Sequence, residues 1–201
     1  MPEKKKASGE WAGLKRELKL QAIILFGFVA LLWAIEIVDQ VVFRGALDNL
    51  GVRPRSLVGL PGILLAPFLH GGFAHLMANS VSLLLLGWLV MLRETRDFFV
   101  VAVLGTLVGG IGIWLIGPSG SIHIGASIVV FAMLGYLLLR GWFDRRFWPI
   151  AGSVVIGLLY GGMLFGMLPG QAGISWEGHL FGFVGGGLAA RLLGPRTSPK
   201  V

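Results

Sequence analysis

The chain has no cysteine among its 201 residues. This absence excludes disulfide bonds and metal sites built from thiolates, and it leaves the redox compartment undetermined. Charge is scarce as well, because charged residues make up 13% of the chain, against about 25% in a soluble globular domain. With 55% hydrophobic residues beside so few charges, the composition indicates a membrane protein.

The apolar residues come in long blocks rather than at helical or alternating spacing. A helix needs about 20 apolar residues to cross the hydrocarbon core of a bilayer. Six blocks reach or approach that length, at residues 20–39, 67–91, 98–117, 124–139, 147–168 and 179–194. The sequence therefore predicts an all-α membrane protein with six transmembrane helices. We expect three parts: a basic N-terminal segment, 1–19, a membrane domain, 20–194, and a tail, 195–201.

Positive charge predominates, with 17 lysines and arginines against 10 acids. If the N-terminus is cytoplasmic, only three of the 17 basic residues lie on the outer side, Arg44, Arg53 and Arg55. This distribution agrees with the positive-inside rule. We therefore expect a multi-pass protein of the cell membrane with both termini in the cytoplasm. The charge is then a topology signal, and no nucleic-acid partner is expected. The basic segment itself is expected to be either a short helix on the inner leaflet or a solvated tail.

Two further features concern how the helices are connected and packed. The connection at 40–66 turns apolar from Leu57 onward but is too short to span, so we expect an interfacial or re-entrant piece. Glycines four residues apart let membrane helices approach closely, which predicts a tightly packed bundle. Such pairs are Gly105/Gly109, Gly178/Gly182 and Gly182/Gly186. No internal repeat is visible, which gives a transporter little support.

Polar residues gather at the same end of three spans. The second, fourth and sixth spans run in the same direction, so their first residues lie on one side of the membrane. Those ends carry His70, His75 and Asn79, then Ser127, then His179. Alone, a histidine in a bundle is more often a structural hydrogen-bonding group, and a serine at a helix start is an ordinary cap. Together on three spans, such residues at membrane depth point to function.

These residue types suit hydrolysis by a serine nucleophile. A hydroxyl needs a base, and we assign Ser127 as nucleophile and His179 as base, with His75 as the competing base. Glu177 is the nearest acid but is expected in a loop, so a dyad rather than a triad is predicted. The Asn79 amide, the His75 ring and the Ser127 backbone N–H are candidate donors to an oxyanion.

Three histidines are candidate metal ligands: His70, His75 and His179. Five-residue spacing is poor for two ligands on one helix, where four is usual, and no acid joins them. No metal and no cofactor are therefore expected.

The same residues resemble the motifs of the rhomboid intramembrane serine proteases. The second-span motif corresponds to His70-x4-His75-x3-Asn79, the start of the Gly-x-Ser-Gly motif to Gly125-Ala126-Ser127, and the last-span His-x2-Gly-x3-Gly motif to His179, Gly182 and Gly186. The three motifs occur in the family's order, and the resemblance covers about residues 20–194.

The resemblance implies a six-transmembrane-helix rhomboid-like bundle with a water-filled cavity open to the outside. It implies Ser127 as nucleophile and His179 as base, with His75, Asn79 and the Ser127 amide around the oxyanion. His70, Gly125, Phe131 and Gly182 would support the site. Substrates would be transmembrane proteins within the lipid bilayer, cut near small residues. The oligomeric state is not predicted.

The chain departs from the family pattern at two positions near the serine. The glycine usual after the serine is Ile128, and its branched side chain is expected either to push helices apart or to shift the Ser127 amide. The aromatic four residues after the serine, commonly tyrosine, is Phe131, which keeps ring stacking on His179 but loses the hydroxyl. The alternative function is therefore a catalytically inert rhomboid-like protein that binds membrane helices.

Overall fold

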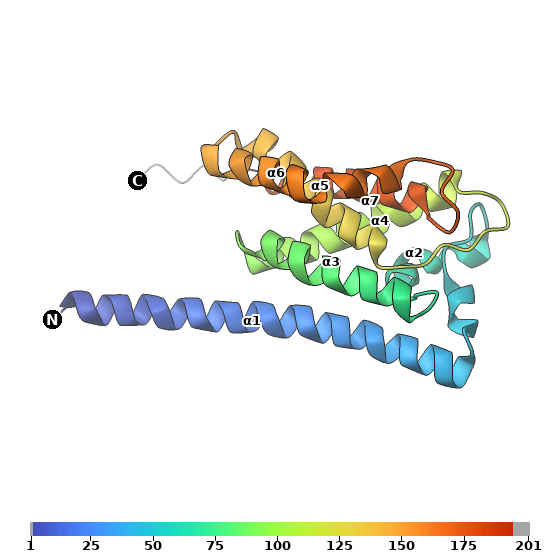
Figure 1. Ribbon diagram of the computed structural model, residues 1–201, viewed down its shortest axis with the longest axis horizontal. Helices are drawn as coiled ribbons and strands as arrows, with labels where there is room; N and C mark the ends of the chain where they lie inside the picture. The colour runs from blue at the N-terminus through green and yellow to red at the C-terminus, as the bar shows by residue number, and fades with distance from the viewer. Residues whose placement is uncertain (1, 195–201) are drawn as a thin grey trace.

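The computed structural model describes residues 2–194, with side chains described from Trp11 onward. Within that range the regular elements are helices, and six of them are long. They are α1 (Pro2–Val38), α3 (Phe73–Met91), α4 (Thr95–Ile116), α5 (Ser127–Asp144), α6 (Phe147–Tyr160) and α7 (Trp176–Leu192). These helices run roughly along one direction, and α1 lies at the edge of the bundle and extends past the others (Figure 1).

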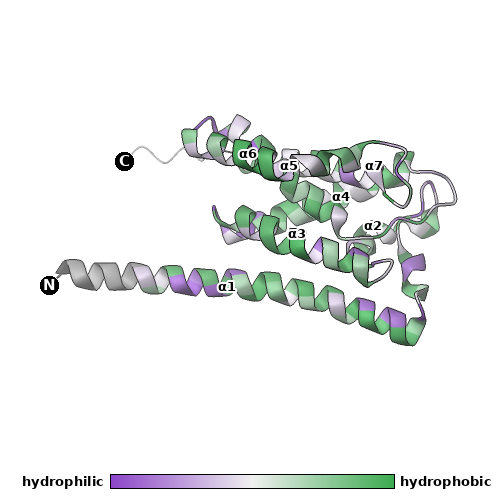
Figure 2. Cartoon of the chain, in the orientation of Figure 1, coloured by the Kyte–Doolittle hydropathy of each residue, from purple (hydrophilic) through white to green (hydrophobic). Residues whose placement is uncertain are grey.

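Five helices in the described part of the chain are long and apolar enough to cross a membrane. Two of them are extended by tighter or looser turns, α1 through the π-helix Asp39–Phe43 and α6 through the 3₁₀-helix η5 (Gly161–Met167). The sixth, α7, has 17 residues and packs most extensively on α5 and α4. Apolar residues run along all of the bundle helices (Figure 2). The predicted all-α membrane bundle is confirmed.

Two of the predicted span boundaries that differ from the structure bear on the candidate site. The second span does not begin at residue 67, because α3 starts at Phe73 after Gly72, whose φ of +114° cannot continue a helix. His70 therefore lies in a turn before α3 rather than on it. The sixth span begins at Trp176 rather than at 179, so Glu177 is not in a loop but in the first turn of α7, where it is 2% exposed.

Two segments before α3 are helical in whole or in part, the basic N-terminal segment and the connection between α1 and α3. The basic segment is helical and continuous with the first span, and no break in α1 marks residue 19. The connection that follows contains short helices, among them α2 (Gly62–Leu65), which packs on α4. Its apolar stretch, Leu57–Phe68, is too short to cross a membrane. The predicted tail, 195–201, lies outside the described residues.

The centre of the bundle is a seam of small residues between α4, α5 and α7. On α5, Ile128 and Ala132 lie four residues apart and therefore on one helix face. Added Cβ atoms on α4 at Gly105 and Gly109 would collide with the side chains of Ala132 and Ile128, respectively. Added Cβ atoms on α7 at Gly182 and Gly186 would collide with the carbonyl oxygens of the same two α5 residues. The glycine spacing thus permits the close packing that the sequence predicts.

Candidate active site

Three helices bring four of the predicted polar residues to one cavity of about 860 Å³. The cavity lies at the end of the bundle where α3, α5 and α7 begin, and residues of the adjoining loops complete its wall. Its lining includes His75, Asn79, Ser127, Phe131 and His179. The juxtaposition expected from the direction of the spans is therefore present in the structure.

Ser127 is the first residue of α5, so its backbone N–H has no helical acceptor. The loop before it is held in place from two sides. The Gly125 N–H donates to the Ala66 carbonyl at 2.8 Å, and the Ala126 N–H donates to His70 Nε2 at 3.3 Å. Gly125 has a φ of +120°, and an added Cβ would meet the His75 ring at 2.7 Å. Only glycine therefore brings this loop against His75.

His70 is fully buried, and its ring lies 5.2 Å from the His75 ring, centroid to centroid. Burial and the neighbouring His75 lower the pKa of His70 to about 4. The ring is then neutral at ordinary pH and accepts the Ala126 N–H. His70 therefore positions the loop before Ser127 instead of lining the cavity.

Asn79 is 6% exposed and follows His75 by one helical turn on α3. Its side-chain nitrogen, Nδ2, is buried and has no hydrogen-bond partner among the described residues. Buried donors are nearly always paired, so an unpaired one at the wall of a cavity is available to a group that enters it.

His179 lies in the first turns of α7 and is held on two sides. Its Nδ1 is 2.9 Å from the Gly166 carbonyl oxygen, which can only accept, so Nδ1 carries the proton. In the neutral ring Nε2 is then free to accept a proton. The Phe131 ring stacks on the imidazole with centroids 4.0 Å apart and an angle of 9°. No hydrogen bond joins Ser127 and His179 among the residues that the structure describes.

Ile128 does not force the helices apart. Its side chain is 2% exposed and points to Gly109 of α4, where only a glycine leaves room for the methyl group. On the α7 side, Gly182 contacts the Ile128 backbone so closely that a Cβ would collide with the carbonyl oxygen. The helices thus accommodate the branched residue next to Ser127 without losing contact.

A second serine–histidine network in the same cavity was missed in the sequence. His123, in the loop before α5, has Nδ1 2.6 Å from Ser175 Oγ and Nε2 2.7 Å from Ser121 Oγ. The Ser121 hydroxyl also lies 2.6 Å from the Pro118 carbonyl, to which it donates. Burial lowers the pKa of His123, and the nearby Glu177 carboxylate partly opposes this shift. The network joins the loop to the start of α7.

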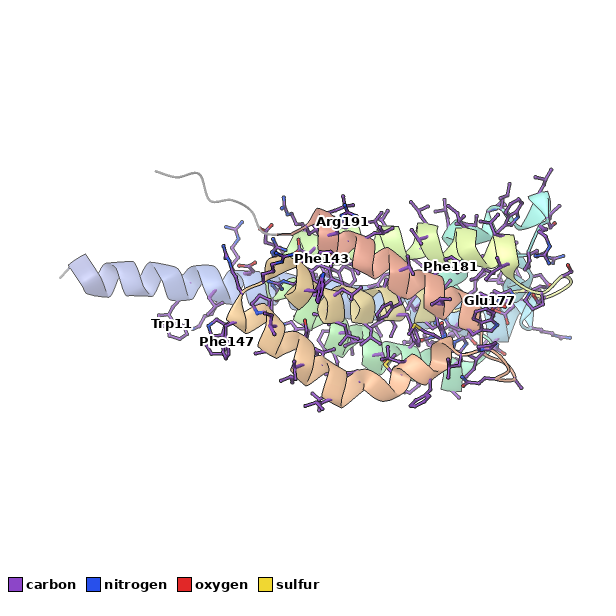
Figure 3. The ribbon with its side chains drawn as sticks, turned by 90° about the horizontal axis from the view of Figure 1, so that it is seen from above. Trp11, Phe143, Phe147, Glu177, Phe181 and Arg191 are labelled. Atoms are coloured by element: carbon purple, nitrogen blue, oxygen red, sulfur yellow. The ribbon has the colours of Figure 1, made fainter. Side chains whose placement is uncertain are left out.

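Figure 3 shows how far α7 reaches across the bundle, with Glu177 at one end and Arg191 near the other. The short distance along the chain from Ser121 to His123 was the available signal for one bond of the network, whereas its bond to Ser175 joins distant segments. The acceptor at Gly166 had no such signal, because it depends on how the segment after α6 folds. Among the described residues, no group of three or more histidines and acids could hold a metal ion.

Comparison with known proteins gives one consistent family. A model of the rhomboid domain matches residues 59–196. An uncharacterised protein of Mycobacterium tuberculosis, Rv1337, is 44% identical over 174 residues, which cover 83% of this chain and 72% of the relative. Another, ML1171 of Mycobacterium leprae, is 42% identical over 179 residues, 85% and 70% of the two chains.

A relative whose name states an activity is rhomboid protease GluP of Bacillus subtilis. It is 31% identical over 149 residues, which cover 72% of this chain and 29% of that protein. The chain therefore belongs to the rhomboid family. It is a multi-pass membrane protein, as the resemblance implied.

Proposed function

We propose that the protein is an intramembrane serine protease that hydrolyses peptide bonds of transmembrane proteins with a Ser127–His179 dyad. The observation that carries the proposal is the shared cavity, which side chains of α3, α5 and α7 line together. Membership of the rhomboid family supports the same reaction. The placement of the protein in the cell membrane with both termini in the cytoplasm is part of the proposal and rests on the distribution of arginine and lysine.

In this reaction the Ser127 hydroxyl transfers its proton to His179 Nε2 as the oxygen attacks the carbonyl carbon of the substrate. The carbonyl oxygen becomes an oxyanion, to which the Ser127 backbone N–H, Asn79 Nδ2 and the His75 ring donate. The imidazolium then gives its proton to the leaving amine, and the peptide bond breaks. Water, deprotonated by His179, hydrolyses the acyl-enzyme and restores the serine. Hydrogen bonds of this kind are often long before substrate binds.

A fluorophosphonate probe, which reacts with activated serines, tests this proposal. Wild-type protein is expected to be labelled, Ser127→Ala to lose the label, and His179→Ala to lose most of it. Matched controls come from the second network, because Ser121 and Ser175 line the same cavity beside another histidine. Ser121→Ala and Ser175→Ala should retain the label. Loss of label in either control, with Ser127→Ala still labelled, would mean that the nucleophile is the serine replaced in that control and not Ser127.

The second candidate function is an inert rhomboid-like protein that binds membrane helices. Two observations favour it: the missing Ser127–His179 hydrogen bond among the described residues, and Ile128 in place of glycine. Folded wild-type protein that fails to label in both detergent and lipid would favour it. A search for membrane proteins shed by wild-type cells but not by Ser127→Ala cells would identify the substrates of the protease.

A further inference from the structure

A second cavity lies at the opposite end of the bundle from the candidate active site. It has a volume of about 470 Å³ and lies between the end of α3, the last turns of α5 and the start of α6. Its lining is mostly apolar and includes two cations, Arg93 and Arg140, together with Trp148 and Gly152. None of these residues lines the active-site cavity.

The two arginines have guanidinium N–H groups that could donate hydrogen bonds to a group in this cavity. Arg93 Nη2 donates to the Gly194 carbonyl at 3.1 Å, while its Nη1 is buried and has no hydrogen-bond partner among the described residues. Arg140 is held through Nε, which donates to Asp144 at 3.0 Å. A buried donor without a partner is costly, so an acceptor that enters the cavity gains a charge-assisted hydrogen bond there.

Exposed aromatic residues near this cavity suit the membrane–water interface. Trp148 is 80% exposed, Phe147 in contact with it is 73% exposed, and Trp142 near the end of α5 is 75% exposed. Exposed aromatic residues at the ends of spans lie at the membrane–water interface. Leu89 of α3, Leu92 just after it and the apolar residues of α6 form the rest of the wall, which suits an acyl chain.

Carboxylates offset part of the positive charge. Asp97 lies 3.8 Å from Arg93 Nε and 4.0 Å from Arg96 Nε, and Asp144 pairs with Arg140. These contacts use the Nε side of Arg93 and Arg140 and orient both guanidinium groups. The same end of the bundle also carries Arg145 and Arg146 without a carboxylate within ion-pair distance among the described residues. Attraction for an anion therefore remains.

We propose that this cavity binds an anionic phospholipid, with its phosphate between Arg93 and Arg140 and one acyl chain along the apolar faces of α3 and α6. Guanidinium groups suit phosphate because they donate two parallel hydrogen bonds to it. Basic pockets between transmembrane helices at the headgroup level are a known form of lipid recognition. The inference does not depend on the proposed protease activity.

The test is lipid binding to the purified, delipidated protein. Native mass spectrometry and thermal unfolding would compare phosphatidylglycerol with phosphatidylcholine of the same acyl chains. We expect phosphatidylglycerol to bind and to raise the unfolding temperature, and Arg93→Gln and Arg140→Gln each to weaken its binding about tenfold, the loss expected for one charge-assisted hydrogen bond. Equal binding of the two lipids would overturn the proposal.

Two further variants separate the charge at this site from surface charge and test the space inside the cavity. Arg96→Gln removes the same charge from the same turn, but its side chain is 54% exposed, pairs with Glu94, and does not line the cavity, so binding should be unchanged. An equal loss in Arg96→Gln would indicate surface charge alone. Gly152→Leu fills the cavity without changing charge, because a Cβ there meets nothing within 4 Å. It should block the lipid, and unimpaired binding would contradict the site.

Inorganic phosphate separates a lipid site from a free-anion site. At the same molar concentration as the lipid, phosphate alone is expected to leave the unfolding temperature unchanged, because it lacks the acyl chain that the apolar wall binds. Stabilisation by phosphate equal to that by phosphatidylglycerol would overturn the lipid assignment.

Discussion

Two parts of the bundle are held together in different ways. In α5, 56% of the most apolar stretch is buried inside the protein, whereas in the span formed by α6 and η5 the share is 6%. The helix α5 lies between α4 and α7 and meets glycines on both. In contrast, α6 packs mainly on α5 and presents large apolar residues outward.

The difference shows which helices fix the positions of the site residues. Ser127 and His179 both come from the seam of α4, α5 and α7, where backbones touch and few alternative packings exist. The more exposed span contributes Met163 to the cavity wall and the Gly166 carbonyl, which fixes the protonated nitrogen of His179. The proposed nucleophile and base thus lie on the more buried part, and the orientation of the proposed base depends on the more exposed part.

The largest expected effect is in the seam. Gly186→Ala adds a Cβ that would collide with the Ala132 carbonyl and lie 2.8 Å from the Tyr136 backbone nitrogen. Because backbone atoms cannot move aside cheaply, we expect destabilisation by about 3 kcal/mol and loss of labelling. Gly152→Ala on α6 is the matched control, since its Cβ meets nothing within 4 Å. It should change the free energy of unfolding by less than about 1 kcal/mol, and equal effects would abolish the distinction between the two parts.

The next effect concerns a donor from α3, outside the seam. Asn79→Ala is expected to slow cleavage of a transmembrane substrate by up to ~10²-fold, as for other oxyanion donors. Stability should change little, because Asn79 Nδ2 has no partner among the described residues. Ser82→Ala is the matched control: Ser82 lines the same cavity, but its hydroxyl donates to the Ala78 carbonyl of its own helix. An unaffected rate in Asn79→Ala would remove that residue from the site.

Ile128→Gly tests whether the seam depends on this branched side chain. Removing a buried isoleucine leaves a cavity beside Gly109, so we expect a loss of about 2 kcal/mol in the free energy of unfolding. Turnover per folded molecule should not fall, since glycine is the residue usual at this position in the family motif. Chemical denaturation together with active-site titration would separate the two quantities. A complete loss of turnover in folded protein would mean that this site is built differently.

The smallest effect is a pH dependence at His123, outside the spans. Its pKa is lowered because burial disfavours the charged ring. A lowered pKa means that the folded state binds a proton less readily than the unfolded chain, so the contribution to stability is complete above pH about 6.5 and is lost as the pH falls through the folded-state pKa. Unfolding temperatures measured between pH 7.5 and pH 5 should decrease, and the decrease should be smaller in His123→Gln. An equal change of unfolding temperature with pH in the two proteins would exclude His123 as its cause.

The sequence predicted the bundle and the cavity because both depend on patterns that are local or periodic. Long apolar blocks specify spans, glycines four residues apart specify close contact, and the direction of the spans brings His75, Ser127 and His179 to one end. The misplaced boundaries have a physical cause. The residues at 67–69 are as apolar as a span, so hydropathy does not show that α3 begins only after Gly72. Glu177 is charged, so hydropathy does not show that α7 already begins at Trp176.

The roles of the site residues remain predictions that the experiments above address. Contacts between distant segments could not be predicted from spacing. The bond from Gly166 to His179 and the bond from Ser175 to His123 depend on how loops fold against α7. Likewise, the room for Ile128 depends on its alignment with Gly109, which a list of glycines does not give.

The length of α1 has a consequence for how the protein can be handled. Gln21 of α1 donates to the Met91 carbonyl, which marks the level where α3 ends. Residues 2–20 continue the same helix past that level, which amounts to about 28 Å at 1.5 Å per residue. A fluorophore or affinity tag attached at the first residues would therefore stand well clear of the lipid surface. It could report on the protein in intact vesicles without disturbing the end of the bundle that holds the candidate active site.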